Sequence, residues 1–313
     1  MHRNRAGLVL AGVVFCGFAL IAQQTAPASA ASQGGRGRGQ QGGGRGGRGA
    51  RRGGKKVVIA WADTRNGIAQ HDSVSHALAT IERLGYESGL WDTYIRTDSN
   101  IISKHPKMTT GQPASGGPSL AMADAIFFMG HREVELTDDQ KADLLAFVHD
   151  DGKGFVAAHI ATTAFLSWPE FGEMIGGRFD GHPWGNVMGT VINEAPDFPA
   201  TKHLPLTFDI RDEFYQTKDF SREKSRVLLR LDASKLPVNQ NVHITNGDFP
   251  IAWAKMYGKG RVFYATFAHD AKTWDDPDIY HIYFEAIKWA LRLTDGNVTP
   301  RPFPGADAAT GEK

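Results

Sequence analysis

The chain is poor in the residues that many hydrolases depend on. Its one cysteine, Cys16, lies in the first 30 residues. The remainder therefore has no disulfide, no thiolate metal site and no cysteine nucleophile. The chain also lacks the Gly-x-Ser-x-Gly elbow of serine hydrolases and the His-Glu-x-x-His helix of many zinc enzymes. Other side chains must carry any chemistry.

Acidic residues are absent from the N-terminal part and abundant in the rest. Residues 1–56 carry ten Lys or Arg residues and no acid, whereas residues 57–313 carry 25 basic and 34 acidic residues, a net charge of −9. Nucleic-acid binding depends on neutralising phosphates. We therefore expect no nucleic-acid partner for the folded part, and a small or neutral ligand instead.

The chain has no apolar run long enough for an ordinary membrane span. Residues 7–22 are almost wholly apolar, follow a positively charged start, and precede the small residues Ala28-Ser29-Ala30. This is the pattern of a cleaved secretory signal over residues 1–30, since a span needs about 20 apolar residues. We expect a bacterial protein that is periplasmic or secreted, with an uncleaved anchor as the alternative.

Residues 31–54 are dense in glycine and arginine. Such a segment cannot bury a core, so we expect a disordered linker. Arg-Gly tracts bind RNA in some proteins, but contact with anionic envelope polymers fits export better. The expected organisation is thus a signal (1–30), a linker (31–54), one α/β domain (55–295) and a flexible tail (296–313).

Apolar, β-branched runs alternate with helical patterns in the domain. Strands are predicted at 55–62, 86–92, 124–130 and 154–158, with helices at 72–85 and 137–149. This alternation is typical of a doubly wound, mostly parallel sheet flanked by helices. Later strands are predicted near 187–194, 206–210, 226–231, 250–256 and 260–268, and a last helix at 278–293. Residues 93–120 form a long insertion, for which we expect a functional reason.

Histidines follow several of the predicted strands. His131, His159 and His269 each come at the end of a strand, and His71 lies in the loop after the first one. The carboxyl ends of parallel strands share one edge of an open α/β sheet, where ligands bind. Because imidazole both transfers protons and binds metals, we predict a histidine-rich site at this edge.

Several short segments, in this order, resemble the ThuA-like domain, which is named for trehalose utilisation. They are His71-Asp72-Ser73, Leu136-Thr137-Asp138-Asp139-Gln140, the run from Gly154 to His159, Gly176-Gly177-Arg178-Phe179 with His182-Pro183, Asp212-Glu213-Phe214-Tyr215, and the run from Gly258 to Tyr264 with His269-Asp270. The resemblance covers residues 56 to about 293. It implies a flavodoxin-like three-layer sandwich similar to class I glutamine amidotransferases. Those enzymes place a cysteine after the strand that corresponds to 154–158, where this chain has His159, so we expect no glutaminase activity.

The candidate site residues combine these sources. His159, His182 and Glu213 are the catalytic candidates; Pro183 stiffens the loop of His182, and the family pattern includes Glu213, in a predicted turn. The substrate-binding candidates are His71, His131, His269, Asp270, Tyr215 and Trp184. Trp184 is included because an indole face can stack on a sugar. Trp61, Trp168 and Trp274 could stack in the same way. The simpler alternatives are histidines that only bond to backbone, a solvated acidic turn and tryptophans in the core.

A divalent metal such as zinc is a further option. Three neutral imidazoles and a carboxylate could bind it and leave one position open. The candidate ligands are His131, His159, His182 and His269. No local motif supports this set, so the hypothesis depends on convergence in space.

The resemblance implies saccharide metabolism, extending to oxidised (keto) sugars. We therefore predict an exported hydrolase, lyase or isomerase of a sugar or glycoside. In it His159 or Glu213 moves a proton, while His131, His182 and His269 polarise an oxygen. The alternative is a non-catalytic saccharide-binding envelope module. The substrate and the oligomeric state stay open, and a homo-oligomer is one option.

Overall fold

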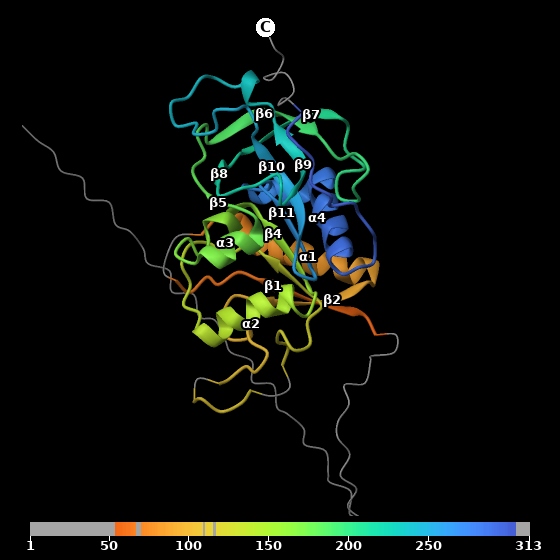
Figure 1. The fold of residues 1–313 in the computed structure, drawn as a ribbon. Helices are drawn as coiled ribbons and strands as arrows, with labels where there is room; N and C mark the ends of the chain where they lie inside the picture. The colour runs from red at the N-terminus through yellow and green to blue at the C-terminus, as the bar shows by residue number, and fades with distance from the viewer. Residues whose placement is uncertain (1–53, 67–69, 109, 115–116, 305–313) are drawn as a thin grey trace, which may run out of the picture. The chain divides into compact units, whose positions relative to one another are not determined.

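A computed structural model describes residues 54–66, 70–108, 110–114 and 117–304. The signal and almost all of the linker predicted for residues 1–54 lie outside this range. The described chain forms one nine-stranded sheet with helices on both faces, and a separate pair of short strands (Figure 1). The α/β sandwich predicted from the sequence is confirmed.

The elements have the following bounds. The sheet contains, in spatial order, β2 (Trp91–Arg96), β1 (Lys56–Trp61), β3 (Ala125–Phe128), β4 (Gly154–Ala158), β11 (Gly260–Ala265), β10 (Pro250–Tyr257), β9 (Arg226–Leu231), β6 (Asn186–Asn193) and β7 (Thr207–Glu213). The short pair is β5 (Arg178–Phe179) and β8 (Thr217–Lys218). The α-helices are α1 (Ser73–Ser88), α2 (Asp138–His149), α3 (Pro169–Ile175) and α4 (Pro277–Ala290), and the 3-10 helices are η1 (His159–Thr163), η2 (Ala233–Lys235) and η3 (Ala271–Asp275).

The sheet has a parallel half and an antiparallel half. Strands β2, β1, β3, β4 and β11 pair in parallel, whereas β10, β9, β6 and β7 continue the sheet through antiparallel pairs. Alternation of direction across four antiparallel pairs gives β7 the same direction as the parallel strands. The carboxyl end of β7 therefore lies at the same edge as the ends of β1, β3, β4 and β11.

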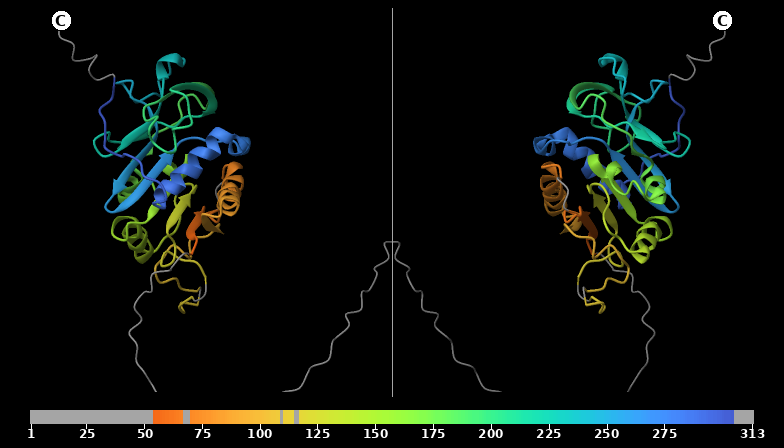
Figure 2. Two further views of the ribbon diagram at one scale, coloured as in Figure 1. Left: turned by 90° about the vertical axis from the view of Figure 1, so that its right-hand side faces the viewer. Right: turned by 90° about the vertical axis from the view of Figure 1, so that its left-hand side faces the viewer.

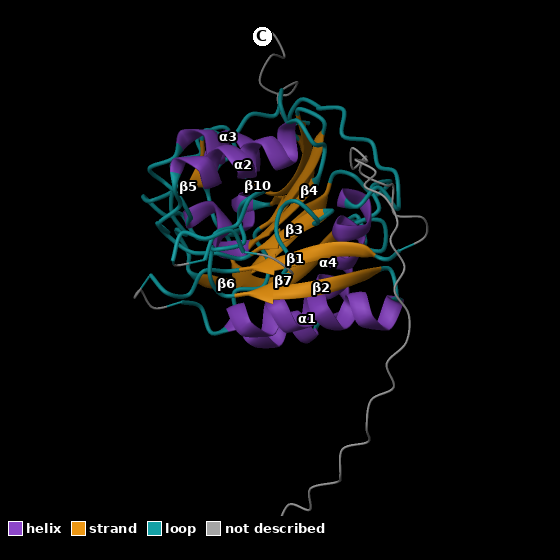
Figure 3. Ribbon diagram, turned by 90° about the horizontal axis from the view of Figure 1, so that it is seen from below, coloured by secondary structure: helices purple, strands orange, loops and turns teal. Residues whose placement is uncertain are grey.

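Alternate side chains of the parallel strands pack into two hydrophobic cores, one on each face of the sheet. One side chain set, with Val58, Phe127 and Val156, packs under α1 and α4. The other set, with Ile59 and Phe155, packs under α2 and α3. Figure 3 shows α1 on one side of the sheet and α2 and α3 on the other, and Figure 2 gives the side views. Burial of both faces explains why these strands are continuous apolar runs.

Most helix ends follow the sequence. Thr137 caps α2 as predicted. Its hydroxyl accepts from the Gln140 N–H, and the side-chain oxygen of Gln140 accepts from the Thr137 backbone N–H. The first helix is a correction, because α1 continues past Gly85 to Ser88, and the next strand starts at Trp91 instead of residue 86. Gly85 stays helical because its missing Cβ leaves room for the Trp91 indole, 2.4 Å from where that Cβ would lie.

The insertion after β2 starts at the carboxyl edge, where the Ser99 hydroxyl donates to the Asp63 carboxylate. Residues 97–124 form no helix or strand in their described part, and Ile101, Ile102 and Leu120 bury there in the second core. In the predicted tail, Thr299 accepts a hydrogen bond from Arg226, and the ring of Phe303 lies against two arginines. None of the helices in the described part is long and apolar enough to cross a bilayer.

The close packing of α4 on β4 gives a stability prediction. A Cβ at Gly154 would lie 2.7 Å from the Cβ and 2.8 Å from the carbonyl oxygen of Ala290. We expect Gly154→Ala to lower the free energy of unfolding by about 1–3 kcal/mol, as overpacking usually does. Gly117→Ala is the control, since nothing lies within 4 Å of its added Cβ. Urea unfolding that gives equal values for the two variants would contradict the packing argument.

Candidate functional site

A cavity of about 830 Å³ opens at the carboxyl edge of the sheet. Most of the predicted site residues line it, namely His71, His131, His182, Glu213, Tyr215, His269 and Asp270. They come from the loop after β1, the ends of β3 and β7, and the loops after β5 and β11. The fold thus brings together side chains that are up to about 200 positions apart in sequence, because parallel strands end at one edge.

His159 forms the floor beneath this cavity. It follows β4 directly, is fully buried, and has a left-handed φ of 41° where the chain turns into η1. Such a conformation costs about 1–3 kcal/mol for a residue other than glycine and is often found at functional sites. The turn directs the imidazole toward the strand ends of β7 and β11.

The hydrogen bonds of His159 fix its tautomer. Its Nδ1 lies 2.5 Å from the carbonyl oxygen of Thr266, which can only accept, so Nδ1 carries the proton. The lone pair of Nε2 then faces Nδ1 of His269 at 3.2 Å. Burial lowers the pKa of His159 to about 3, against the opposing effect of the hydrogen bond to the Thr266 carbonyl, so this ring is neutral near pH 7.

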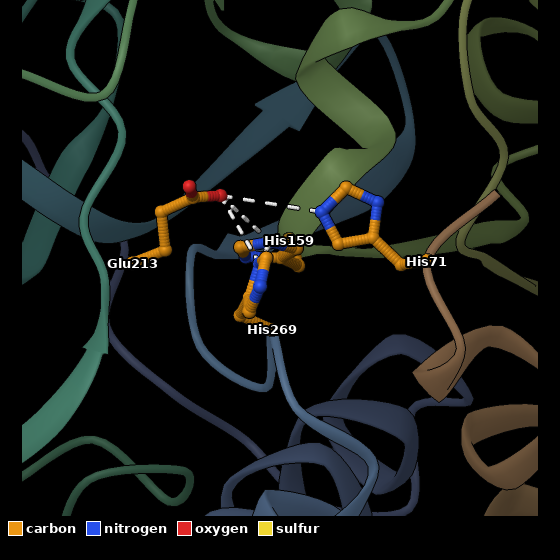
Figure 4. Close-up of side chains that lie close together, drawn as sticks. All are labelled: His71, His159, Glu213 and His269. Carbon is orange, nitrogen blue, oxygen red and sulfur yellow. Dashed lines mark hydrogen bonds and ion pairs between the residues drawn. The ribbon is translucent and has the colours of Figure 1, made fainter. Parts of the chain in front are cut away.

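Glu213 is the acidic member of the group. It ends strand β7, so the turn predicted for it is wrong. Its Oε2 lies 3.1 Å from Nδ1 of His269, 3.7 Å from Nε2 of His159 and 4.0 Å from Nε2 of His71, as Figure 4 shows. Its Oε1 lies 3.3 Å from Nδ1 of His182. Burial by itself would raise the pKa of Glu213, but the hydrogen bond from His269 and the nearby imidazoles of His71 and His182 hold it well below its usual range.

His269 is coupled to this carboxylate. Its hydrogen bond to Glu213 raises the pKa of His269, against the opposing effect of burial. Its other ring nitrogen, Nε2, lies 3.9 Å from the carboxylate of Asp270. Asp270 in turn accepts a hydrogen bond from the Asn186 side chain. The imidazole is therefore held between two carboxylates.

Asp212 joins the two halves of the sheet behind these side chains. One carboxylate oxygen accepts the backbone N–H of Ala268 at 2.7 Å, and the other accepts those of Glu213 at 2.8 Å and His269 at 3.1 Å. Ala268 has a left-handed φ of 80°. Burial raises the pKa of Asp212 to about 6, although these backbone hydrogen bonds favour its ionised form. The buried carboxyl fixes the turn that aims His269.

Tyr215 and His131 complete the predicted group. The Tyr215 ring lies 4.5 Å, centroid to centroid, from that of His159 and is almost fully buried. The imidazole of His131 lies 5.9 Å from that of His71, and its carbonyl accepts from Asn66. Both side chains line the cavity beside the Glu213 group.

The tryptophans do not line the cavity. The indole of Trp184 donates to the Pro237 carbonyl and packs on Phe249, so the predicted sugar-stacking position of Trp184 is not supported by its placement. Trp61 and Trp274 are fully buried and Trp168 is nearly so, which places all three in the core. The apolar part of the cavity wall comes instead from Leu166 and Phe179.

Four side chains of the described residues offer donor atoms that could hold one metal ion. They are His71, His159, Glu213 and His269, whose donor atoms all lie within 4.8 Å of one another. This set differs from the predicted ligands His131, His159, His182 and His269. His131 stands outside the group, and His182 faces the opposite oxygen of Glu213. Their place is taken by the loop residue His71 and by the carboxylate.

Sequence reasoning missed the function of Asp212 and the cavity wall formed by Leu166 and Phe179. The sequence predicts an acidic turn for Asp212 and assigns it no other role. An adjacent Asp-Glu pair at the end of a strand gives no signal that one carboxylate faces backbone N–H groups and the other faces imidazoles. Phe179 lies within a segment that carried the resemblance, but nothing in that segment identified it as a cavity wall.

Comparison with known proteins agrees with the fold. Solved structures similar to this one include a putative ThuA-like protein from Bacteroides uniformis, with 21% identity and a TM-score of 0.60 over 78% of this chain and 95% of that chain. Another is a putative ThuA-like protein from Parabacteroides merdae, with 16% identity and a TM-score of 0.55 over 80% of this chain and 94% of that chain. No curated protein matches the sequence. The family model for ThuA, described as trehalose utilisation, matches residues 56–290, and the chain therefore belongs to the ThuA family.

Proposed function

We propose that the protein is an exported enzyme that acts on a neutral keto-sugar or keto-glycoside. The family description, trehalose utilisation, indicates a sugar-related role. The observation that carries the catalytic part is the meeting of Glu213 with His71, His182 and His269 over one cavity. Its volume of about 830 Å³ lies within the range of small-molecule sites and accommodates one or two sugar rings.

His182 is the proton-transfer residue in this proposal. Its side chain is 48% exposed, and Glu213 holds its Nδ1. A carboxylate in this position orients an imidazole and stabilises the imidazolium that forms during proton transfer. The free Nε2 can then take a proton from the carbon next to a keto group.

The other members of the group stabilise the charge that develops. His71 and His269 line the cavity next to Glu213 and polarise the carbonyl oxygen of the substrate. Elimination and isomerisation of a keto-glycoside share this proton abstraction as their first step, and hydrolysis would use the same groups on water. His159 is fully buried, so it supports His269 and Glu213 and does not itself touch the substrate.

The charge of the cavity wall bears on the substrate class. Four carboxylates line it, those of Asp72, Glu133, Glu213 and Asp270, against the guanidinium of Arg132 and the imidazole of His269, whose pKa is raised. This balance disfavours phosphorylated or carboxylated sugars because like charges repel at short range. We include export in the proposal because residues 1–30 have the features of a secretory signal.

A first test concerns proton transfer. We expect His182→Gln to lower kcat on a keto-glycoside by about 10²–10⁴-fold, the usual contribution of a positioned acid or base, with little change in KM. The matched control is His76→Gln on the outer side of α1, where His76 pairs with Asp275. An activity within twofold of wild type in His182→Gln would remove it from the mechanism. Saccharide binding without turnover in the wild type, measured by calorimetry, would favour the non-catalytic binding module.

A second test concerns substrate charge. We expect a neutral keto-glycoside to have a kcat/KM at least about fivefold above that of its uronic acid counterpart, since one unfavourable charge contact costs on the order of 1 kcal/mol or more. Glu133→Gln should narrow this ratio by improving the charged substrate. The measurement is steady-state kinetics at low ionic strength. Equal values for the two substrates would contradict the charge argument.

A further inference from the structure

We infer that His71, His159, Glu213 and His269 form the binding site of one divalent transition-metal ion. The four donor atoms come from four separate segments and converge within 4.8 Å. Figure 4 shows the three imidazoles turned toward Oε2 of Glu213. The inference rests on the proposed function in one respect, since the ion would be the group that polarises the substrate oxygen. Metal binding itself can be measured whether or not that function is correct.

The distances between the donor atoms suit a metal ion. A tetrahedral ion with ligands at about 2.1 Å has its ligands roughly 3.4 Å apart. Oε2 of Glu213 lies 3.1 Å from Nδ1 of His269 and 3.7 Å from Nε2 of His159, and the two imidazole nitrogens are 3.2 Å apart. These three form nearly one face of such a tetrahedron. His71 stands slightly farther away, at 4.0 Å from Oε2.

The outer contacts are those that metal-binding histidines require. A ligating imidazole usually donates its other N–H to a carbonyl or carboxylate, which fixes the tautomer and raises the basicity of the ligating nitrogen. His159 donates Nδ1–H to the Thr266 carbonyl, so Nε2 presents a lone pair to the group. The Nε2 of His269 lies 3.9 Å from the carboxylate of Asp270, which is beyond hydrogen-bond distance but leaves Nδ1 as the nitrogen that faces the group.

The donor set indicates the class of metal. Three imidazoles with one carboxylate suit Zn²⁺, Co²⁺ and related first-row ions, whereas Ca²⁺ and Mg²⁺ prefer oxygen ligands. His71, Glu213 and His269 line the cavity, while His159 lies behind them. An ion held by this group would therefore face the cavity, where it could polarise a substrate oxygen as a Lewis acid.

The site can be tested directly with Zn²⁺ and Co²⁺. We expect the folded, chelator-treated protein to bind one Zn²⁺ by calorimetry and to give a visible Co²⁺ spectrum. His269→Ala and His71→Ala should each weaken Zn²⁺ binding by at least about 100-fold, since loss of even an outer-shell partner costs about 10–100-fold. His71 comes from a loop, so its variant keeps the test valid if His269→Ala does not fold.

The control histidine is His131, which lines the same cavity outside the ligand group. His131→Ala should retain wild-type affinity for Zn²⁺. Failure of the wild type to bind one equivalent of either ion, or equal loss of affinity in the His131 and His71 variants, would overturn the inference. Turnover of keto-glycosides by protein that elemental analysis shows to be metal-free, and that binds no added Zn²⁺, would overturn the metal site and leave the proposed function. Tight Zn²⁺ binding without turnover would leave the metal site and remove the proposed function.

Asp212 provides an independent test as a positioning residue. Asp212 is not one of the four ligands, but its carboxylate accepts hydrogen bonds from the backbone N–H groups of two of them, Glu213 and His269. Asp212→Asn should weaken Zn²⁺ binding by about 10–100-fold and shift the Co²⁺ spectrum under conditions where circular dichroism shows a folded protein. The control is Asp209→Asn on the same strand, whose exposed carboxylate binds Thr190. A lowered melting temperature with unchanged affinity and spectrum would reduce Asp212 to a purely structural role.

Discussion

One buried carboxyl group connects the two parts of the sheet that build this site. Three strands, β10, β9 and β6, separate β7 from β11 in the sheet, yet Asp212 at the end of β7 accepts hydrogen bonds from Ala268 and His269 after β11. Removing a buried acceptor leaves buried donors unsatisfied, which costs about 1–3 kcal/mol for each group. The position of Glu213 relative to His269 depends on this link, and so does every interaction proposed at the cavity.

Much of the parallel half follows from the sequence. The strands from 124–130 and 154–158 are predicted almost as observed, because burial on both faces makes them short, continuous apolar runs. The same reasoning places His131, His159 and His269 at one edge, since parallel strands that are followed by helices must end together. Helix α2 is also predicted well, because Thr137 and Gln140 form a local capping pattern.

The antiparallel half is harder to predict. Strand β7 has exposed residues at alternate positions and ends in Asp212 and Glu213, so its last residues look like a polar turn. Their burial results from contacts with the loop after β11, which is more than 50 positions away in sequence. For the same reason the sequence favoured His131 and His182 as metal ligands, while the folded chain places His71 and the carboxylate next to His159 and His269. Local patterns contain no information about which of several histidines at one edge come within bonding distance.

The division of the site between the two halves also bears on how it forms. The imidazoles belong to the parallel layer, but the carboxylate arrives with the strand at the far edge of the sheet, and the two meet only when that edge has docked. All contacts of the site are distant in sequence, since even His159 and His269 are 110 positions apart, so each of them requires closure of a long loop. Without the edge strand, His159 and His269 would lack the carboxylate that both of them face. Assembly of the Glu213 group therefore requires the whole nine-stranded sheet, and not only its parallel half.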